Sequence, residues 1–298
     1  PACNTRCNTM LFADPVAHAL AYPFAPPRFS YLFRHDAAAP HRAETVDLEL
    51  RSVAGADLPL CDVSVKDGRE TFAFKDRVAV ISAGSNASFQ RLISKFAKDG
   101  LTADFPAILA RVPHLVPVYS AHISAYGSVA GTLYREQGAA SLLHIAFLSP
   151  HELWCINKSE GLGNNYALCM IDRLDADLGA GVRLERALAY VSRRGAFAPE
   201  GVPLRLSAFQ VEGSHAHMTD QHQLQGRLQA YLGDTQAVEA FIRQNINDAD
   251  LRLARTARMA PVALPCRFRG LYCVAGDLDA PLARLPADFV EPLGDGHA

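Results

Sequence analysis

Apolar and polar residues alternate from Glu44 onward, and this alternation predicts the first strands of the chain. Residues 45–53 (TVDLELRSV) and 60–74 (LCDVSVKDGRETFAF) place apolar side chains at nearly every second position, which is the period of a strand with one buried face. Asp67-Gly68 inside the second segment is a turn dipeptide, so a β-hairpin is expected here. Residues 76–84 (DRVAVISAG) are apolar nearly throughout and predict a strand that is covered on both faces.

A tight turn and a helix are expected after this strand. The turn is Gly84-Ser85-Asn86, and residues 88–100 (SFQRLISKFAKDG) carry apolar side chains at helical spacing. Gly100 lies beyond the expected end of the helix. The unpaired N–H groups of the turn and of the first helical residues should point toward whatever lies at the end of the strand.

Three prolines, Pro106, Pro113 and Pro117, mark the next segment as a loop, because proline cannot donate a backbone hydrogen bond to a sheet. Residues 116–136 and 141–148 then predict further strands of a barrel.

A capped helix precedes residue 160. Ser149 is the expected N-cap, Pro150 suits the first turn, and Glu152 completes a capping box. This helix should end just before Glu160 and Gly161, which places the Glu160 carboxylate at a junction between a helix and a strand.

The second half of the chain predicts two strands followed by two helices. Residues 165–173 and 183–194 have strand patterns, whereas residues 221–232 and 235–246 are amphipathic helices. Residues 1–45 and the proline-containing tail show no sustained period and are expected to be irregular. The pattern as a whole predicts an α+β fold with a mixed β-barrel flanked by helices.

Composition narrows the class of protein. The 298 residues are 49% hydrophobic and 20% charged, which is enough to bury a sizeable core. A formal net charge of -2, without a dense basic cluster, argues against a nucleic-acid partner. No apolar run approaches the roughly 18 residues of a membrane span, so we expect no membrane partner and a cytoplasmic location.

Cysteines and histidines give weak signals for metal binding. The seven cysteines are an odd number scattered along the chain, so reduced thiols are expected, and Cys3 and Cys7 alone do not complete a metal site. His215 and His217 lack a third ligand nearby. Because there is also no dinucleotide or phosphate-loop fingerprint, we expect no cofactor and no metal.

Two features carry candidate chemistry. The turn at residues 84–86 can cradle a carboxylate or another polar group, although capping of the helix is the ordinary role of such a turn. Glu160 can transfer a proton, although an exposed glutamate at a helix end is common. His122 on a barrel strand is either a second proton carrier or a structural histidine.

Together, and in this order, the segments resemble the γ-glutamylcyclotransferase-like superfamily. The matching segments are ISAGSN before a helix, YGSVAGTLYRE, HELWCINKSEG with Tyr166 after it, and ALAYVSRRG. Members of this superfamily typically show a Tyr-Gly-Ser-Asn turn, a Gly-x-Leu/Val-Tyr strand, a segment similar to Asp-x-x-Glu-Gly, and a tyrosine on a later strand. The resemblance covers about residues 76 to 245.

The resemblance implies roles for individual residues. Glu160 would be the general acid/base, Gly84, Ser85 and Asn86 would bind the substrate, and Tyr166 and Tyr190 would be aromatic pocket residues, with His122 as a further lining candidate. The sequence departs from the pattern at Ala83, where the superfamily usually has tyrosine, and at Asn157, where aspartate is common.

The resemblance also implies domains and a reaction. Residues 1–75 would be an N-terminal arm and β-hairpin extension packed on the barrel, residues 76–250 the catalytic domain, and residues 251–298 an irregular C-terminal extension. The implied reaction is metal-independent cleavage of an amide bond in a small molecule, with release of 5-oxoproline as the parent case. An amide or lactam hydrolase, a non-catalytic binding protein, and a homodimer formed through the strands at 44–80 are the alternatives.

Overall fold

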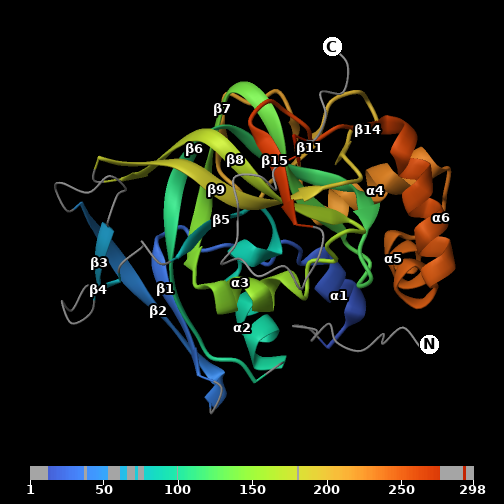
Figure 1. Cartoon of the computed structure of the whole chain (residues 1–298). Coiled ribbons are helices and arrows are strands. Elements are labelled where there is room, and N and C mark those ends of the chain that lie inside the picture. The colour runs from blue at the N-terminus through green and yellow to red at the C-terminus, as the bar shows by residue number, and fades with distance from the viewer. Residues whose placement is uncertain are drawn as a thin grey trace.

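A computed structural model describes residues 13–36, 39–52, 61–65, 71–72, 77–98, 100–179, 181–275 and 291–292. The fold is mixed α and β, as the sequence predicts, with a closed barrel at its centre and helices around it (Figure 1). No described helix combines the length and the apolar character that crossing a membrane would require.

Five strands close the barrel. They are β5 (Val78–Ser82), β6 (Ala103–Ile123), β7 (Val129–Leu148), β8 (Tyr166–Gly179) and β9 (Val182–Ser192). The ring runs in the order β8, β9, β5, β7 and β6, and Arg111 of β6 pairs with Asp177 of β8 to close it. The β5–β9 pair is parallel and the other four are antiparallel. Closure leaves no open edge between these strands. Side chains from their inner faces fill the interior of the barrel.

The same sheet continues beyond the barrel on both sides. β1 (Tyr31–Asp36) pairs with β6, and β2 (Ala39–Ser52), β3 (Cys61–Val65) and β4 (Thr71–Phe72) follow outward by antiparallel pairing. These strands confirm the strand pattern expected from residue 45 onward, whereas Asp67-Gly68 lies outside the described residues. On the other side, β15 (Leu271–Ala275) pairs with β8, and β16 (Glu291–Pro292) pairs with β15.

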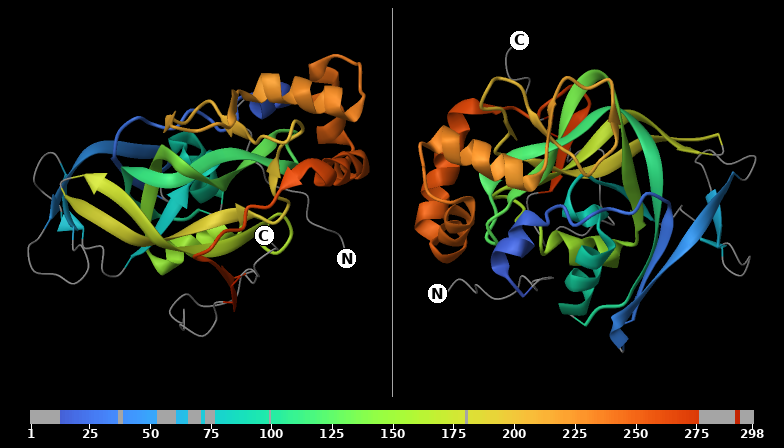
Figure 2. Two further views of the ribbon diagram at one scale, coloured as in Figure 1. Left: turned by 90° about the horizontal axis from the view of Figure 1, so that it is seen from above. Right: turned by 180° about the vertical axis from the view of Figure 1, so that it is seen from behind.

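Helices and short strands cover the barrel. The helices are α1 (Pro15–Leu20), α2 (Phe89–Lys98), α3 (Pro150–Asn157), α4 (Gln221–Leu232), α5 (Val238–Asn247) and α6 (Ala249–Met259), with 3₁₀ turns at Ser85–Ala87 and Ala260–Val262. The short strands are β10 (Ala196–Phe197), β11 (Leu204–Leu206), β12 (Val211–Glu212), β13 (His217–Thr219) and β14 (Ala263–Leu264). Both views in Figure 2 place α4, α5 and α6 together at one end, with β2 and β3 at the opposite end.

The prediction of a loop around the three prolines is wrong, because all three lie within β6. Pro106 and Pro113 occupy places where the sheet tolerates a missing N–H. Pro106 pairs only with Leu32 of β1, before pairing with β7 begins, and Pro113 adjoins a register shift at which His114 has a φ of 61°. Pro117 pairs with β7 and directly precedes the bridge from β6 to β11.

The two segments expected to be irregular are also more ordered than the pattern indicates. The N-terminal arm forms α1 and β1, and its aromatic side chains Tyr31 and Phe33 are fully buried in the core. The C-terminal extension at 251–298 begins inside α6 and adds β15 to the sheet. Tertiary packing therefore orders segments whose own periodicity is weak.

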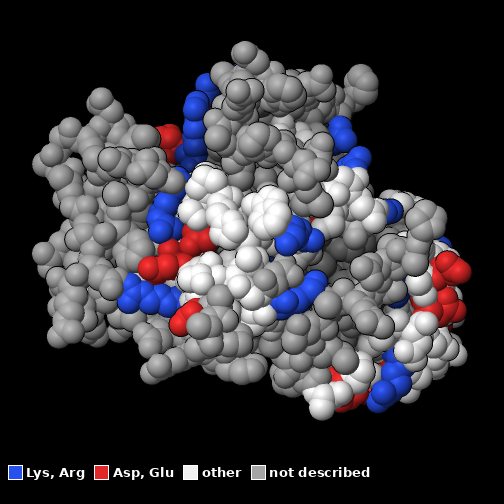
Figure 3. Space-filling model, turned by 60° about the horizontal axis from the view of Figure 1, so that its bottom comes forward, with Lys and Arg blue, Asp and Glu red and all other residues white. Residues whose placement is uncertain are grey.

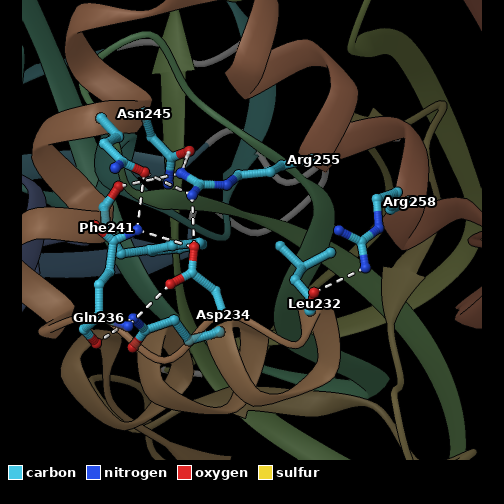
Figure 4. Close-up of polar contacts among 9 residues, drawn as sticks. Leu232, Asp234, Gln236, Phe241, Asn245, Arg255 and Arg258 are labelled. Atoms are coloured by element: carbon cyan, nitrogen blue, oxygen red, sulfur yellow. Dashed lines mark hydrogen bonds and ion pairs between the residues drawn. The ribbon is translucent and has the colours of Figure 1, made fainter.

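A buried arginine ties the three C-terminal helices together (Figure 4). The Arg255 guanidinium donates to Asn245 Oδ1, Gln244 Oε1 and Asp234 Oδ2, each at 2.8 Å. It also lies 4.1 Å from the centre of the Phe241 ring. Asp234 balances the charge of Arg255, and Asn245 and Gln244 accept hydrogen bonds from its guanidinium. The arginine therefore holds α6 against α5 and the end of α4.

Surface charge is mixed on the face shown in Figure 3. Lysine and arginine side chains lie there among aspartate, glutamate and uncharged side chains.

Candidate functional site

One cavity of about 210 Å³ opens beside the end of β5. Its wall combines the turn after β5, the inner face of α2, the connection between β6 and β7, the segment after α3, and tyrosines from the arm, β8 and β9. The residues that carry polar side chains into this wall are Tyr22, Ser85, Asn86, Arg91, Lys95, His122, Ser124, Tyr126, Ser159, Glu160, Asn165, Tyr166 and Tyr190.

The cavity brings together all seven residues named from the sequence. They are Gly84, Ser85, Asn86, His122, Glu160, Tyr166 and Tyr190. Four separate parts of the fold contribute them: the turn after β5, β6, the segment after α3, and the neighbouring strands β8 and β9. Their proximity is a property of the fold, whereas their roles in binding and catalysis stay predictions.

The turn after β5 is built by the chain itself. Ala87 N donates to Gly84 O and Ser88 N donates to Ser85 O, each at 3.0 Å, which closes the short 3₁₀ turn before α2. No acceptor is found for the backbone N–H groups of Ser85 and Asn86 within the described parts of the chain. These two groups are therefore available to an acceptor in the cavity.

Glu160 is fixed by the end of α3. The predicted capping box is present, because Glu152 N donates to Ser149 Oγ and Ser149 N donates to a Glu152 carboxylate oxygen. At the other end of α3, Ser159 N donates to Ile156 O at 3.0 Å and Glu160 N donates to Asn157 O at 3.1 Å. These bonds set the backbone that directs the Glu160 side chain toward the cavity.

Asn86, Lys95 and Glu160 form a connected polar group. Asn86 Nδ2 donates to Glu160 Oε1 at 3.1 Å, and Lys95 Nζ donates to Asn86 Oδ1 at 2.5 Å and to Glu160 Oε1. The side chains of Lys95 and Glu160 are only 7% and 13% exposed. Burial lowers the pKa of Lys95, Glu160 opposes that shift, and the positive charge of Arg91 adds to it.

Two tyrosines named from the sequence hold neighbouring groups in place. The Tyr166 hydroxyl donates to Gly131 O at 2.7 Å, and the Tyr190 hydroxyl donates to Asn157 Oδ1 at 2.5 Å. Burial raises the pKa of both phenols well above the usual value, with the Glu160 charge adding to the effect. Both phenols therefore keep their protons and act as hydrogen-bond donors. Asn157, which stands where the superfamily often has aspartate, is the acceptor for Tyr190.

His122 is neutral over the physiological range. Its side chain is almost fully buried, its Nδ1 lies 2.7 Å from Ser120 Oγ, and its ring meets the Tyr166 ring edge-on. Burial, with a smaller contribution from Arg194, lowers the pKa of His122 to about 3. This favours the structural alternative over a second proton carrier, because a carrier needs a pKa near the working pH.

Sequence reasoning missed several polar residues of the cavity wall, among them Tyr22, Arg91, Lys95 and Tyr126. Arg91 and Lys95 are four apart on α2, so their shared side of the helix next to the turn was a usable signal. Arg91 lies 5.5 Å from the Tyr126 ring centre and 5.8 Å from that of Phe24. No local pattern marks Tyr22, which reaches the cavity only through the path of the arm.

The sequence predicts no metal site, and the weak signals for one come from Cys3, Cys7, His215 and His217. No group of three or more histidine, cysteine, aspartate or glutamate side chains that could hold a metal ion occurs within the part of the chain that the structure describes. Cys3 and Cys7 lie outside that part. His217 Nδ1 lies 3.9 Å from Glu200 Oε2.

Comparisons with known proteins do not assign a family. A scan against protein-family models finds no match, and searches of curated proteins and of solved structures find none either. The γ-glutamylcyclotransferase-like assignment therefore stays a prediction, and the fold is described as a mixed α+β structure with a closed five-strand barrel.

Proposed function

We propose that this protein is an enzyme that acts on an amide bond of a small molecule, in the manner of a cyclotransferase, with Glu160 as general acid/base. The observation that carries the proposal is the contact of Asn86 with Glu160 inside one cavity. A proton-transferring carboxylate and the backbone donors of the turn then lie within reach of the same small substrate.

The chemistry needs one group that both accepts and returns a proton. The attacking nitrogen forms a bond to the amide carbon, the carbonyl π electrons move to oxygen, and the attacking nitrogen gives its proton to Glu160. The C–N bond to the leaving amine then breaks as Glu160 returns the proton to that amine, and the carbonyl re-forms. This sequence of steps starts from a Glu160 carboxylate, whose Oε1 accepts a hydrogen bond from Lys95 Nζ.

The neighbours of Glu160 suit this role. Asn86 and Lys95 both donate to Oε1, which orients the carboxylate and leaves Oε2 for the substrate nitrogen. The N–H groups of Ser85 and Asn86 can bind the carbonyl oxygen or a carboxylate of the substrate.

Charge in the cavity favours an anionic substrate. Arg91 and Lys95 are basic side chains, whereas Glu160 is the only acidic side chain among the described residues of the wall. A γ-glutamyl compound would bring a carboxylate into this positive environment, where opposite charges attract strongly because water is partly excluded.

Replacement of Glu160 by glutamine tests the proposal. A panel of γ-glutamyl amides, simple lactams and simple amides is offered to the wild-type protein, to Glu160→Gln and to Glu185→Gln, in which an exposed acid on β9 is replaced as a control. We expect Glu160→Gln to lose about 10²- to 10⁴-fold in rate, and Glu185→Gln to keep the wild-type rate. Turnover by Glu160→Gln at a near wild-type rate would contradict the proposal.

The same panel separates the alternatives. Formation of 5-oxoproline indicates cyclisation, whereas free glutamate indicates attack by water and thus a hydrolase. A non-catalytic binding protein is favoured by one observation, the ion pair that neutralises Glu160 with Lys95. That alternative predicts tight binding of a panel member without any turnover.

A further inference from the structure

Among the described residues of the N-terminal arm, Tyr22 reaches the cavity. Tyr22 follows α1 and is 5% exposed, and its side chain forms part of the cavity wall. Its hydroxyl oxygen accepts a hydrogen bond from Gly131 N at 2.5 Å. The phenol is therefore fixed at its tip by the barrel, although it belongs to the arm.

Two glycines make room for this hydroxyl. A Cβ atom at Gly84 would overlap the Tyr22 hydroxyl oxygen, and a Cβ atom at Gly131 would lie 2.9 Å from it. Neither glycine has a positive φ, so close approach, not backbone conformation, explains why a side chain does not fit at either position. Gly84 belongs to the turn that cradles the predicted substrate, so the hydroxyl lies directly against this cradle.

The hydroxyl proton has no acceptor in the described part of the protein. The oxygen is occupied as an acceptor by Gly131 N, and no bond donated by the Tyr22 hydroxyl is found among the described residues. Because the group is nearly buried and lines the cavity, its proton can be used by a molecule that binds there.

We propose that Tyr22 is a catalytic residue supplied by the arm, whose hydroxyl donates a hydrogen bond to the carbonyl oxygen of the substrate. This inference rests on the proposed function and adds a residue to it. The hydrogen bond strengthens as negative charge develops on the oxygen when the amide carbon is attacked, and the phenol keeps its proton throughout. Burial raises the pKa of Tyr22 well above its usual value, so the phenol is protonated at any working pH.

The hydrogen bond can be measured without turnover. The probe is 5-oxoproline labelled with ¹³C at the lactam carbonyl, because a donated hydrogen bond moves the resonance of that carbon downfield. The wild-type protein is compared with Tyr22→Phe, with Glu160→Gln, and with Tyr119→Phe. Tyr119 is a matched control, since its buried hydroxyl donates to Thr219 O at 3.3 Å and does not line the cavity.

We expect a downfield shift in the wild-type protein, Glu160→Gln and Tyr119→Phe, and loss of most of that shift in Tyr22→Phe. An unchanged shift in folded Tyr22→Phe would overturn the role of Tyr22 while leaving the proposed function intact. If the wild-type protein does not bind the probe, the inference and the cyclotransferase proposal both fail. If Tyr22→Phe is unfolded, Gly131→Ala provides the second variant, because it displaces the hydroxyl and leaves the phenol in the chain, and it should reduce the shift in the same way.

Discussion

Asn86 donates its side-chain amide to the Glu160 carboxylate over 3.1 Å, although the two residues are 74 positions apart in the chain. The contact joins the turn after β5 to the end of α3. Lys95 of α2 donates a hydrogen bond to each of the two side chains. A nearly buried polar group of this kind is costly unless its members are paired.

The first prediction concerns the ion pair. Lys95→Met should lower the free energy of unfolding by about 2–4 kcal/mol, because Glu160 is left as a nearly buried charge without its cation. The double variant Lys95→Met, Glu160→Gln should recover part of this loss. Lys98→Met on the exposed side of α2 is the control and should change stability by less than about 0.5 kcal/mol. Urea denaturation measures all four proteins, and equal stability of Lys95→Met and Lys98→Met would argue against the pair.

The second prediction concerns pH. The pKa of His122 is about 3 in the folded state and 6.5 for the unfolded chain, so between these values the unfolded state binds more protons. Stability should therefore fall as pH decreases below 6.5, by up to about 1.4 kcal/mol per pH unit from this residue. In His122→Gln the decrease should be shallower over the same range. Denaturation at several pH values checks this, with His151→Gln on the surface as control; an unchanged slope in His122→Gln would contradict the assignment.

The third prediction concerns the close approach at Gly84. Gly84→Ala should destabilise the protein by about 1–3 kcal/mol, because the new methyl group overlaps the Tyr22 hydroxyl. In a Tyr22→Phe background the same change should cost less, since the next atom of the ring, Cζ, is 3.5 Å away. Gly226→Ala in α4 meets no atom within 4 Å and should be neutral or stabilising. An equal cost of Gly84→Ala in both backgrounds would mean that Tyr22 does not set the limit.

The fourth prediction concerns the C-terminal helices. Arg255→Met should cost about 2–4 kcal/mol, because Asp234 and three further acceptors lose their common donor. Arg243→Met is the control, since that side chain is 56% exposed and forms a 3.6 Å surface pair with Asp14. Thermal unfolding of the two variants compares them directly, and similar melting temperatures would show that the Arg255 network contributes little.

Strong periodicity was a reliable guide to the fold. The strands β5, β8 and β9 and the helices α2, α4 and α5 lie where the pattern of apolar residues predicts them. α6 was missed because its buried side includes Arg255 and Thr256, so no apolar stripe marks it. The prolines of β6 led to the incorrect prediction of a loop. Whether a strand tolerates a proline depends on which neighbouring strand pairs with it at that position, and the sequence pattern does not show this.

The site was accessible to sequence reasoning only in part. Glu160 and residues 84–86 stand out because each follows a regular element, and the order of the motifs brought them together. Lys95 looks like an ordinary charge of an amphipathic helix, and its burial depends on an acid from a distant segment. Tyr22 depends on the path of the arm and on two glycines far along the chain, which no local pattern encodes.

A crystal structure of the protein with 5-oxoproline bound would show whether Glu160 and the turn at residues 84–86 hold one substrate together. We expect the lactam in the cavity, with its nitrogen within about 3.2 Å of a Glu160 carboxylate oxygen and its carboxylate or carbonyl oxygen at the N–H groups of Ser85 and Asn86. Binding of the ligand elsewhere, or in the cavity with Glu160 still directed only at Lys95 and Asn86, would contradict this expectation.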